Sequence, residues 1–104
     1  MSKLKSIDPP KRVSHSRNKF ALGHVLITPG VRSALMIEEI LEAIQRHQAG
    51  DWGEVSEIDR EENELSIRGG FRLFSIYLSS EGTSFWVITE ADRSSTTVLL
   101  PAES

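Results

Sequence analysis

The chain contains no cysteine among its 104 residues. This absence excludes disulfide bonds, thiolate metal sites and a cysteine nucleophile, and it is typical of cytoplasmic proteins. The sequence also lacks an uninterrupted apolar run of the roughly 18–20 residues that a membrane helix needs. Its basic start is followed by no apolar segment of the kind found in secretory signals. We therefore expect a cytoplasmic protein without a membrane segment.

Lysine is absent after Lys19, so positive charge is concentrated at the N-terminus. Residues 1–20 carry six basic residues against one acidic residue, whereas residues 21–104 carry six arginines against fourteen acidic residues. We expect residues 1–19 to form a disordered basic arm and residues 20–104 to form a single domain. Because an acidic body repels phosphate backbones, nucleic acid is expected to touch only the arm. The alternative is a solvated arm, or one that lies against the acidic body.

The three histidines do not show the spacing of a metal site. His15, His24 and His47 form neither an HxH nor an HxxxH pattern, and no cysteine assists them. The pair Gly69-Gly70 is too short to match a phosphate-binding loop. We therefore expect no metal and no cofactor.

Two helices are predicted between residues 28 and 70. Thr28 followed by Pro29 is a typical helix start, and the apolar period after it predicts one helix over residues 31–48. A capping serine, Ser56, predicts a second helix to about Arg68, with a glycine pair as its end. The apolar residues of this second helix predict a thin buried edge made of Ile58, Leu65 and Ile67.

The last third of the chain is predicted to be β-structure. Residues 71–78, 84–89 and 95–100 are rich in aromatic and β-branched residues, and short polar turns separate them. A further short strand is predicted within residues 20–28. The pattern indicates an α+β fold with two helices packed on a three- to four-stranded antiparallel meander sheet, in the order β-α-α-β-β-β.

Both faces of the predicted sheet are apolar. Phe74 and Ile76 project from one face and Phe71 and Leu73 from the other, so the pattern does not decide which face is buried. Either both faces are covered, or one of them is an interaction surface. The sequence therefore predicts a protein partner or a homodimer as one alternative.

A set of polar and aromatic residues, densest around the last hairpin turn, forms the candidate site. Histidine titrates near neutral pH, while arginine and tyrosine can hold a phosphate or a developing charge. The alternative is structural, because aspartate is a common turn residue and a loop tryptophan usually anchors its loop by burying most of its ring. The candidate residues are His47, Asp51, Trp52, Arg72, Ser75, Tyr77, Thr89, Glu90, Asp92 and Arg93.

Several blocks of residues 20–101 resemble a family of small bacterial proteins often labelled plasmid-related, some of which carry a type I restriction subunit label. The resemblance implies a context of mobile elements and no specific activity. Members usually have a Ser-Pro break between two short helices. Residues Met36–Glu39 contain no such break, and its absence favours one longer helix here. The resembling blocks are Leu22-Gly-His-Val, Thr28-Pro-Gly, Arg46-His-Gln-Ala-Gly-Asp-Trp-Gly, Asn63, Arg72-Leu-Phe-Ser with Tyr77, and residues 86–101 with Thr-Glu-Ala-Asp-Arg-Ser.

Two functions are compatible with these features. The first is a non-enzymatic accessory protein that binds a protein partner or a small ligand through the polar edge of its C-terminal hairpin. The second is a small nuclease or toxin-like endoribonuclease, with the basic arm steering RNA and His47, Arg72 and Arg93 at its site. The sequence itself does not specify a reaction.

Overall fold

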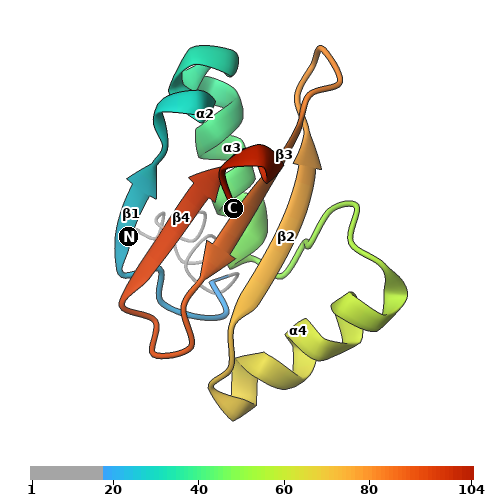
Figure 1. Cartoon of the computed structure of the whole chain (residues 1–104). Coiled ribbons are helices and arrows are strands. Elements are labelled where there is room, and N and C mark those ends of the chain that lie inside the picture. The colour runs from blue at the N-terminus through green and yellow to red at the C-terminus, as the bar shows by residue number, and fades with distance from the viewer. Residues whose placement is uncertain (1–17) are drawn as a thin grey trace, which may run out of the picture.

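The computed structural model describes residues 18–104, which fold into an α+β unit (Figure 1). The predicted arm therefore lies largely outside the described residues. The predicted fold class is confirmed, with helices followed by an antiparallel meander. In chain order the elements are β1 (His24–Ile27), α2 (Pro29–Ala34), α3 (Ile37–Gln48), α4 (Glu57–Gly69), β2 (Leu73–Leu78), β3 (Ser84–Thr89), β4 (Ser95–Leu99) and the 3-10 turn η1 (Pro101–Glu103).

The first strand corrects the prediction of a wholly antiparallel sheet. The four strands lie in the order β1-β4-β3-β2, and β1 runs parallel to β4 while the other pairs are antiparallel. In the register, Leu26 lies opposite Thr97. A strand's own residues do not encode its direction, because that depends on how the intervening helices return the chain to the sheet.

The predicted helix over residues 31–48 is wrong, because the chain breaks at Leu35 and Met36. Leu35 has an extended backbone, and its N–H donates to the Val31 carbonyl at the end of α2. Met36 is also extended and precedes α3. The break lets the Leu35 side chain enter the core, which a continuous helix would have pointed elsewhere. The predicted caps are confirmed, since Thr28 Oγ1 accepts the Val31 N–H and Ser56 Oγ accepts the Asp59 N–H.

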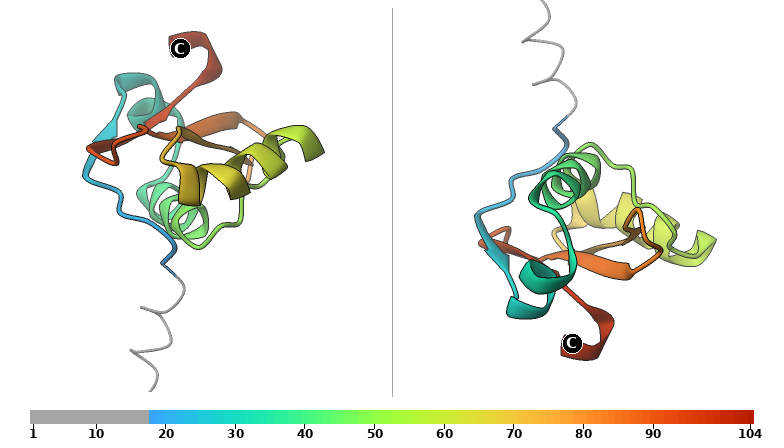
Figure 2. Two further views of the ribbon diagram at one scale, coloured as in Figure 1. Left: turned by 90° about the horizontal axis from the view of Figure 1, so that it is seen from below. Right: turned by 90° about the horizontal axis from the view of Figure 1, so that it is seen from above.

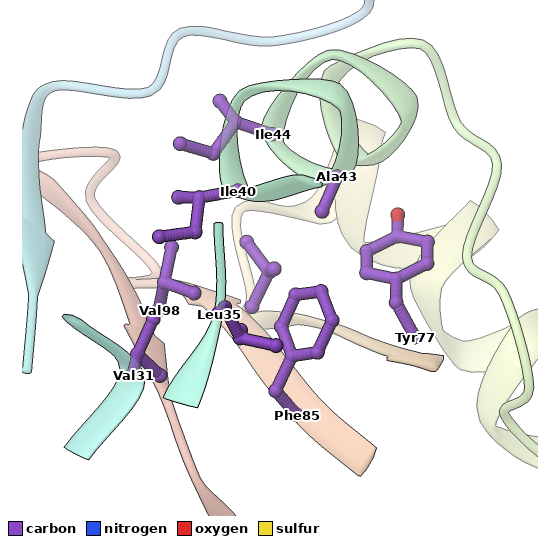
Figure 3. Close-up of a cluster of buried hydrophobic side chains, with 9 residues drawn as sticks. Val31, Leu35, Ile40, Ala43, Ile44, Tyr77, Phe85 and Val98 are labelled. Carbon is purple, nitrogen blue, oxygen red and sulfur yellow. The ribbon is translucent and has the colours of Figure 1, made fainter. Parts of the chain in front are cut away.

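The hydrophobic core lies between α3 and one face of the sheet. Ile40, Ala43 and Ile44 point from α3 toward this face, and Val31 and Leu35 close the core at one end (Figure 3). The sheet contributes Tyr77, Phe85, Val87 and Val98. The structure thereby decides which sheet face is buried. Packing of this kind stabilises the fold by roughly 25 cal/mol for each Å² of apolar surface removed from water.

The opposite face of the sheet is more exposed, and we call it the open face. Figure 2 shows α3 on one side of the sheet and the C-terminal turn η1 on the other. Helix α4 lies beside the edge strand β2 (Figure 1). Half-buried side chains project from the open face, whereas those on the α3 face of β2 and β3 are buried.

Candidate functional site

His47 lies inside the core, at the centre of a chain of hydrogen bonds. Its Nδ1 is 2.6 Å from Ser75 Oγ and its Nε2 is 2.9 Å from Thr89 Oγ1. Thr89 Oγ1 is 2.7 Å from Thr96 Oγ1, which donates to the Leu22 carbonyl at 2.8 Å. The side chains of His47, Ser75, Thr89 and Thr96 are all 0% exposed.

The direction of each bond in this network follows from the number of protons. Thr96 gives its only hydroxyl proton to a carbonyl, so Thr89 must donate to Thr96. Thr89 then has only an acceptor left for His47, which must carry its proton on Nε2. In a neutral ring Nδ1 carries no proton and accepts the hydroxyl proton of Ser75. The network therefore accommodates a neutral imidazole that is protonated on Nε2.

The electrostatic surroundings agree with that assignment. Burial, together with the positive charge of Arg93, lowers the pKa of His47 from 6.5 to about 3. His47 is thus uncharged at neutral pH and enclosed by protein. In this position it joins α3 to strands β2 and β3 through Ser75 and Thr89.

Asp51, Trp52 and Tyr77 join the end of α3 to strand β2. Arg46 donates to Asp51 Oδ2 from Nε at 2.7 Å, which lowers the pKa of the Asp51 carboxyl, and its guanidinium lies 4.6 Å from the centroid of the Tyr77 ring. The Tyr77 hydroxyl donates to the Asp51 carbonyl, and burial raises the Tyr77 pKa. The interpretation of Trp52 as an anchor is confirmed, because its ring is 2% exposed and its Nε1 donates to Glu64 Oε2 on α4.

Arg93 ties the hairpin corner to α4. Its backbone is left-handed, with φ of 62°, and its guanidinium donates to carbonyl oxygens only. From Nη1 it reaches Phe71 at 2.7 Å, and Glu90 and Ala91 at 3.0 Å each, while Nη2 reaches Ser66 at 2.7 Å. The turn that contains Arg93 is closed by Asp92 Oδ1, which accepts the Ser94 N–H. Hydrogen bonds from the side chain and the backbone of Ser94 lower the pKa of Asp92. Arg93 and Asp92 therefore act as structural residues of the corner.

Arg72 and Glu90 are the corner residues that face solvent. Their closest atoms are 3.6 Å apart, and both side chains are well exposed, so the ion pair is weak. The ten predicted site residues thus divide among three places: the buried network, the end of α3 and the hairpin corner. His47 and Tyr77 do not converge with Arg72 and Arg93 on one cleft.

Helix α4 turns its polar side toward the sheet, which corrects the predicted apolar edge. Of the predicted edge, Ile58 and Leu65 are exposed and only Ile67 is half-buried, whereas Asn63 and Ser66 are buried. Asn63 Nδ2 donates to the Phe74 carbonyl at 2.7 Å, and Asn63 Oδ1 accepts the Phe74 N–H at 3.1 Å. An amide side chain suits this place because it offers the same donor and acceptor as a neighbouring strand would.

A groove of about 440 Å³ lies between α4 and the start of β2. Sequence reasoning missed it, because Leu65 was assigned to a buried helix edge and the pattern left open whether Phe71 or Phe74 is exposed. The apolar part of its lining is made of Leu65, Phe71 and Phe74, and the charged part of Asp59, Glu62 and Arg72.

Comparisons with known proteins give no match: neither models of protein families, nor curated proteins, nor solved structures resemble the chain closely enough. The resemblance to plasmid-related proteins therefore stays a prediction. Within residues 18–104, no cluster of three or more histidine, aspartate or glutamate side chains is placed to hold a metal ion. None of the helices in that range has the length and hydropathy needed to cross a bilayer.

Proposed function

We propose that this chain is a non-enzymatic interaction protein that binds a protein partner across the open face of its sheet and the adjoining hairpin corner. The observation that carries the proposal is the apolar character of this face. The side chains of Phe74, Ile76, Trp86 and Ile88 are all half-buried and lie together in the sheet register.

The open face has the composition of an interface centre. Phe74 and Trp86 pack edge to face with ring centroids 5.2 Å apart, and aromatic residues are enriched at the centres of protein interfaces. Leu78 extends the apolar surface along β2, and Leu26 on β1 lies on the same face beyond Thr97 of β4. Each leucine is more than half exposed. Exposed apolar surface of this kind is typical of interaction sites in soluble proteins.

The hairpin corner supplies a polar border to the same face. Phe74 and Ile88 are paired in the sheet, and Arg72 and Glu90 lie two residues from them, beyond the end of the paired strands. The side chains of Arg72 and Glu90 are exposed and form a weak ion pair. A partner can replace that pair with its own charges at little cost. The polar edge predicted from the sequence is thus continuous with the apolar face, and charges at such a border contribute to partner selection.

The internal use of the acid–base residues favours binding over catalysis. His47 is neutral and enclosed, and Arg93 is committed to four carbonyl oxygens. The endoribonuclease alternative gains no support from these positions. On the resemblance to plasmid-related proteins, we propose a partner from the context of mobile elements, with host defence or restriction proteins among the candidates.

The test compares two leucines that are equally exposed, at 52%, on opposite sides of the molecule. Leu26 belongs to the open face, whereas Leu41 lies on α3. A photo-crosslinking amino acid at each position in cells identifies what contacts each side, and the purified partner is then titrated calorimetrically. We expect Leu26→Asp and Leu78→Asp to weaken binding at least tenfold and Leu41→Asp to leave it unchanged.

The opposite pattern would contradict the proposal, as would a partner that crosslinks only at position 41. A crosslink between two copies at position 26 would identify the partner as a second copy of the chain. Sedimentation of the wild type and Leu26→Asp then decides whether that contact forms a dimer.

A further inference from the structure

We propose that the groove between α4 and β2 binds the chain's own N-terminal segment, residues 3–13. The groove shares Phe74 and Arg72 with the proposed partner surface, but the test below uses the isolated chain and needs no partner. The inference begins from the groove, whose apolar floor is formed by Leu65, Phe71 and Phe74. Leu65 and Phe71 are 72% and 64% exposed, so much of this apolar surface is open to an occupant. The volume of about 440 Å³ is within the range of sites that hold a ligand.

The charge at the groove favours a basic occupant. Asp59 and Glu62 lie one turn apart on α4 and both line the groove. Arg72 on the other side is partly neutralised by Glu90 at 3.6 Å. A segment that enters this groove is therefore expected to bring positive charge together with aliphatic side chains.

The N-terminal segment, residues 3–13, has both positive charge and aliphatic side chains. It carries four basic residues, and three aliphatic residues are interleaved with them. Asp8 is its one acidic residue. The basic residues are Lys3, Lys5, Lys11 and Arg12, and the aliphatic residues are Leu4, Ile7 and Val13.

The described chain begins close to α4. The Lys19 N–H donates to the Gln48 carbonyl at 2.8 Å, and the ring of Phe20 stacks on Trp52 with centroids 6.1 Å apart. Trp52 in turn donates to Glu64 on α4 at 2.9 Å. A helix is about 10–12 Å wide, and each extended residue adds up to about 3.3–3.6 Å, so the segment is long enough to pass around α4. The covalent link raises its effective concentration at the groove.

The test uses the absence of cysteine in the native chain. Ser6→Cys introduces a single thiol for a nitroxide spin label in the full-length, ¹⁵N-labelled protein. We expect the amide signals of Leu65, Phe71 and Phe74 to lose most of their intensity, while those of α3 residues such as Leu41 keep theirs. Raising the salt to about 1 M should restore the lost intensity in part, because the Debye length falls to about 3 Å.

Neighbouring glutamates on α4 provide a matched pair of variants. Glu62→Lys changes a residue of the groove lining and should restore the signals at Leu65 and Phe71 at least twofold. Glu61→Lys makes the same change of charge at an exposed residue outside that lining and should leave the broadening as it is.

Three results would overturn the inference. Broadening that is spread evenly over the protein would show that the segment does not bind the groove. Equal effects of Glu62→Lys and Glu61→Lys would show only general attraction to the acidic body. Broadening that persists at full strength when spin-labelled ¹⁴N chains are mixed with ¹⁵N chains that carry no spin label would assign the groove to the segment of a second copy.

Discussion

Helices α3 and α4 have almost the same length, 12 and 13 residues, but they bury opposite kinds of side chain. Helix α3 buries Ile40, Ala43 and Ile44, together with His47. Helix α4 buries Asn63 and Ser66 and exposes Leu65. The difference follows from what each helix contacts in the sheet.

Helix α3 lies over a sheet face, which presents side chains, so apolar packing stabilises the contact. Helix α4 lies along the edge of β2, where backbone N–H and C=O groups would otherwise lack partners. Asn63 satisfies those of Phe74, and the segment before α4 satisfies those of Ile76 through Trp52 and Glu54. The polar side of a helix is therefore the correct side to bury when its neighbour is a strand edge.

The largest expected effect tests the apolar contact of α3. Ile40 is 3% exposed, so Ile40→Ala should lower the free energy of unfolding by about 2–5 kcal/mol through lost burial and the cavity left behind. Ile37 on the same helix is more than half exposed, and Ile37→Ala should change it by less than about 0.5 kcal/mol. Urea unfolding followed by tryptophan fluorescence measures both. Equal losses would mean that α3 packs through another side.

The next effect concerns the one polar group on the buried side of α3. The folded state lowers the pKa of His47 from 6.5 to about 3, so only the unfolded chain binds this proton between those values. The contribution of the neutral His47 to the free energy of unfolding is therefore complete above about pH 6.5 and is lost as the pH falls toward 3. From pH 7 to pH 5 the free energy of unfolding should fall by about 2 kcal/mol, at roughly 1.4 kcal/mol per pH unit.

Two histidine variants isolate that contribution. His47→Gln should flatten the pH dependence of unfolding between pH 5 and 7, whereas His24→Gln, at an exposed strand position, should keep the wild-type slope. An unchanged slope in His47→Gln would contradict the neutral, Nε2-protonated imidazole.

The smallest expected effect tests the polar contact of α4. Asn63→Ala removes both partners of the Phe74 backbone and should cost about 1–2 kcal/mol, since water reaches these part-buried bonds. Leu65→Asn, on the exposed side of the same helix, should cost less than about 0.5 kcal/mol. If the polar substitution at residue 65 proved more harmful than the apolar one at residue 63, the assigned orientation of α4 would be wrong.

Much of the local structure was predictable from short stretches of sequence. Thr28 and Ser56 cap α2 and α4 as predicted, and Gly70 ends α4 in a left-handed conformation. The hairpin strands also lie where their aromatic and β-branched residues indicated. Each of these signals depends on residues within about four positions of one another, so the sequence contains them directly.

The candidate site was predictable only in part. Trp52 was recognised as an anchor, but the partners of His47 and Arg93 were not. His47 meets Ser75 and Thr89, which are 28 and 42 residues away, and Arg93 meets carbonyl oxygens that any residue type could supply. Contacts with backbone groups leave no mark on the sequence of the partner, so composition alone assigned these side chains to a common site.

The sequence by itself determined the caps, the turns, the α+β class and the separation of a basic N-terminus from an acidic body. The tertiary structure decided the parallel direction of β1, the break at Leu35, the buried face of the sheet and the side that α4 turns inward. The physical reason is that local propensity acts through neighbouring residues, whereas burial depends on which distant backbone or side-chain groups a segment meets. Both the open face and the groove beside α4 result from such contacts between segments that are distant in the sequence.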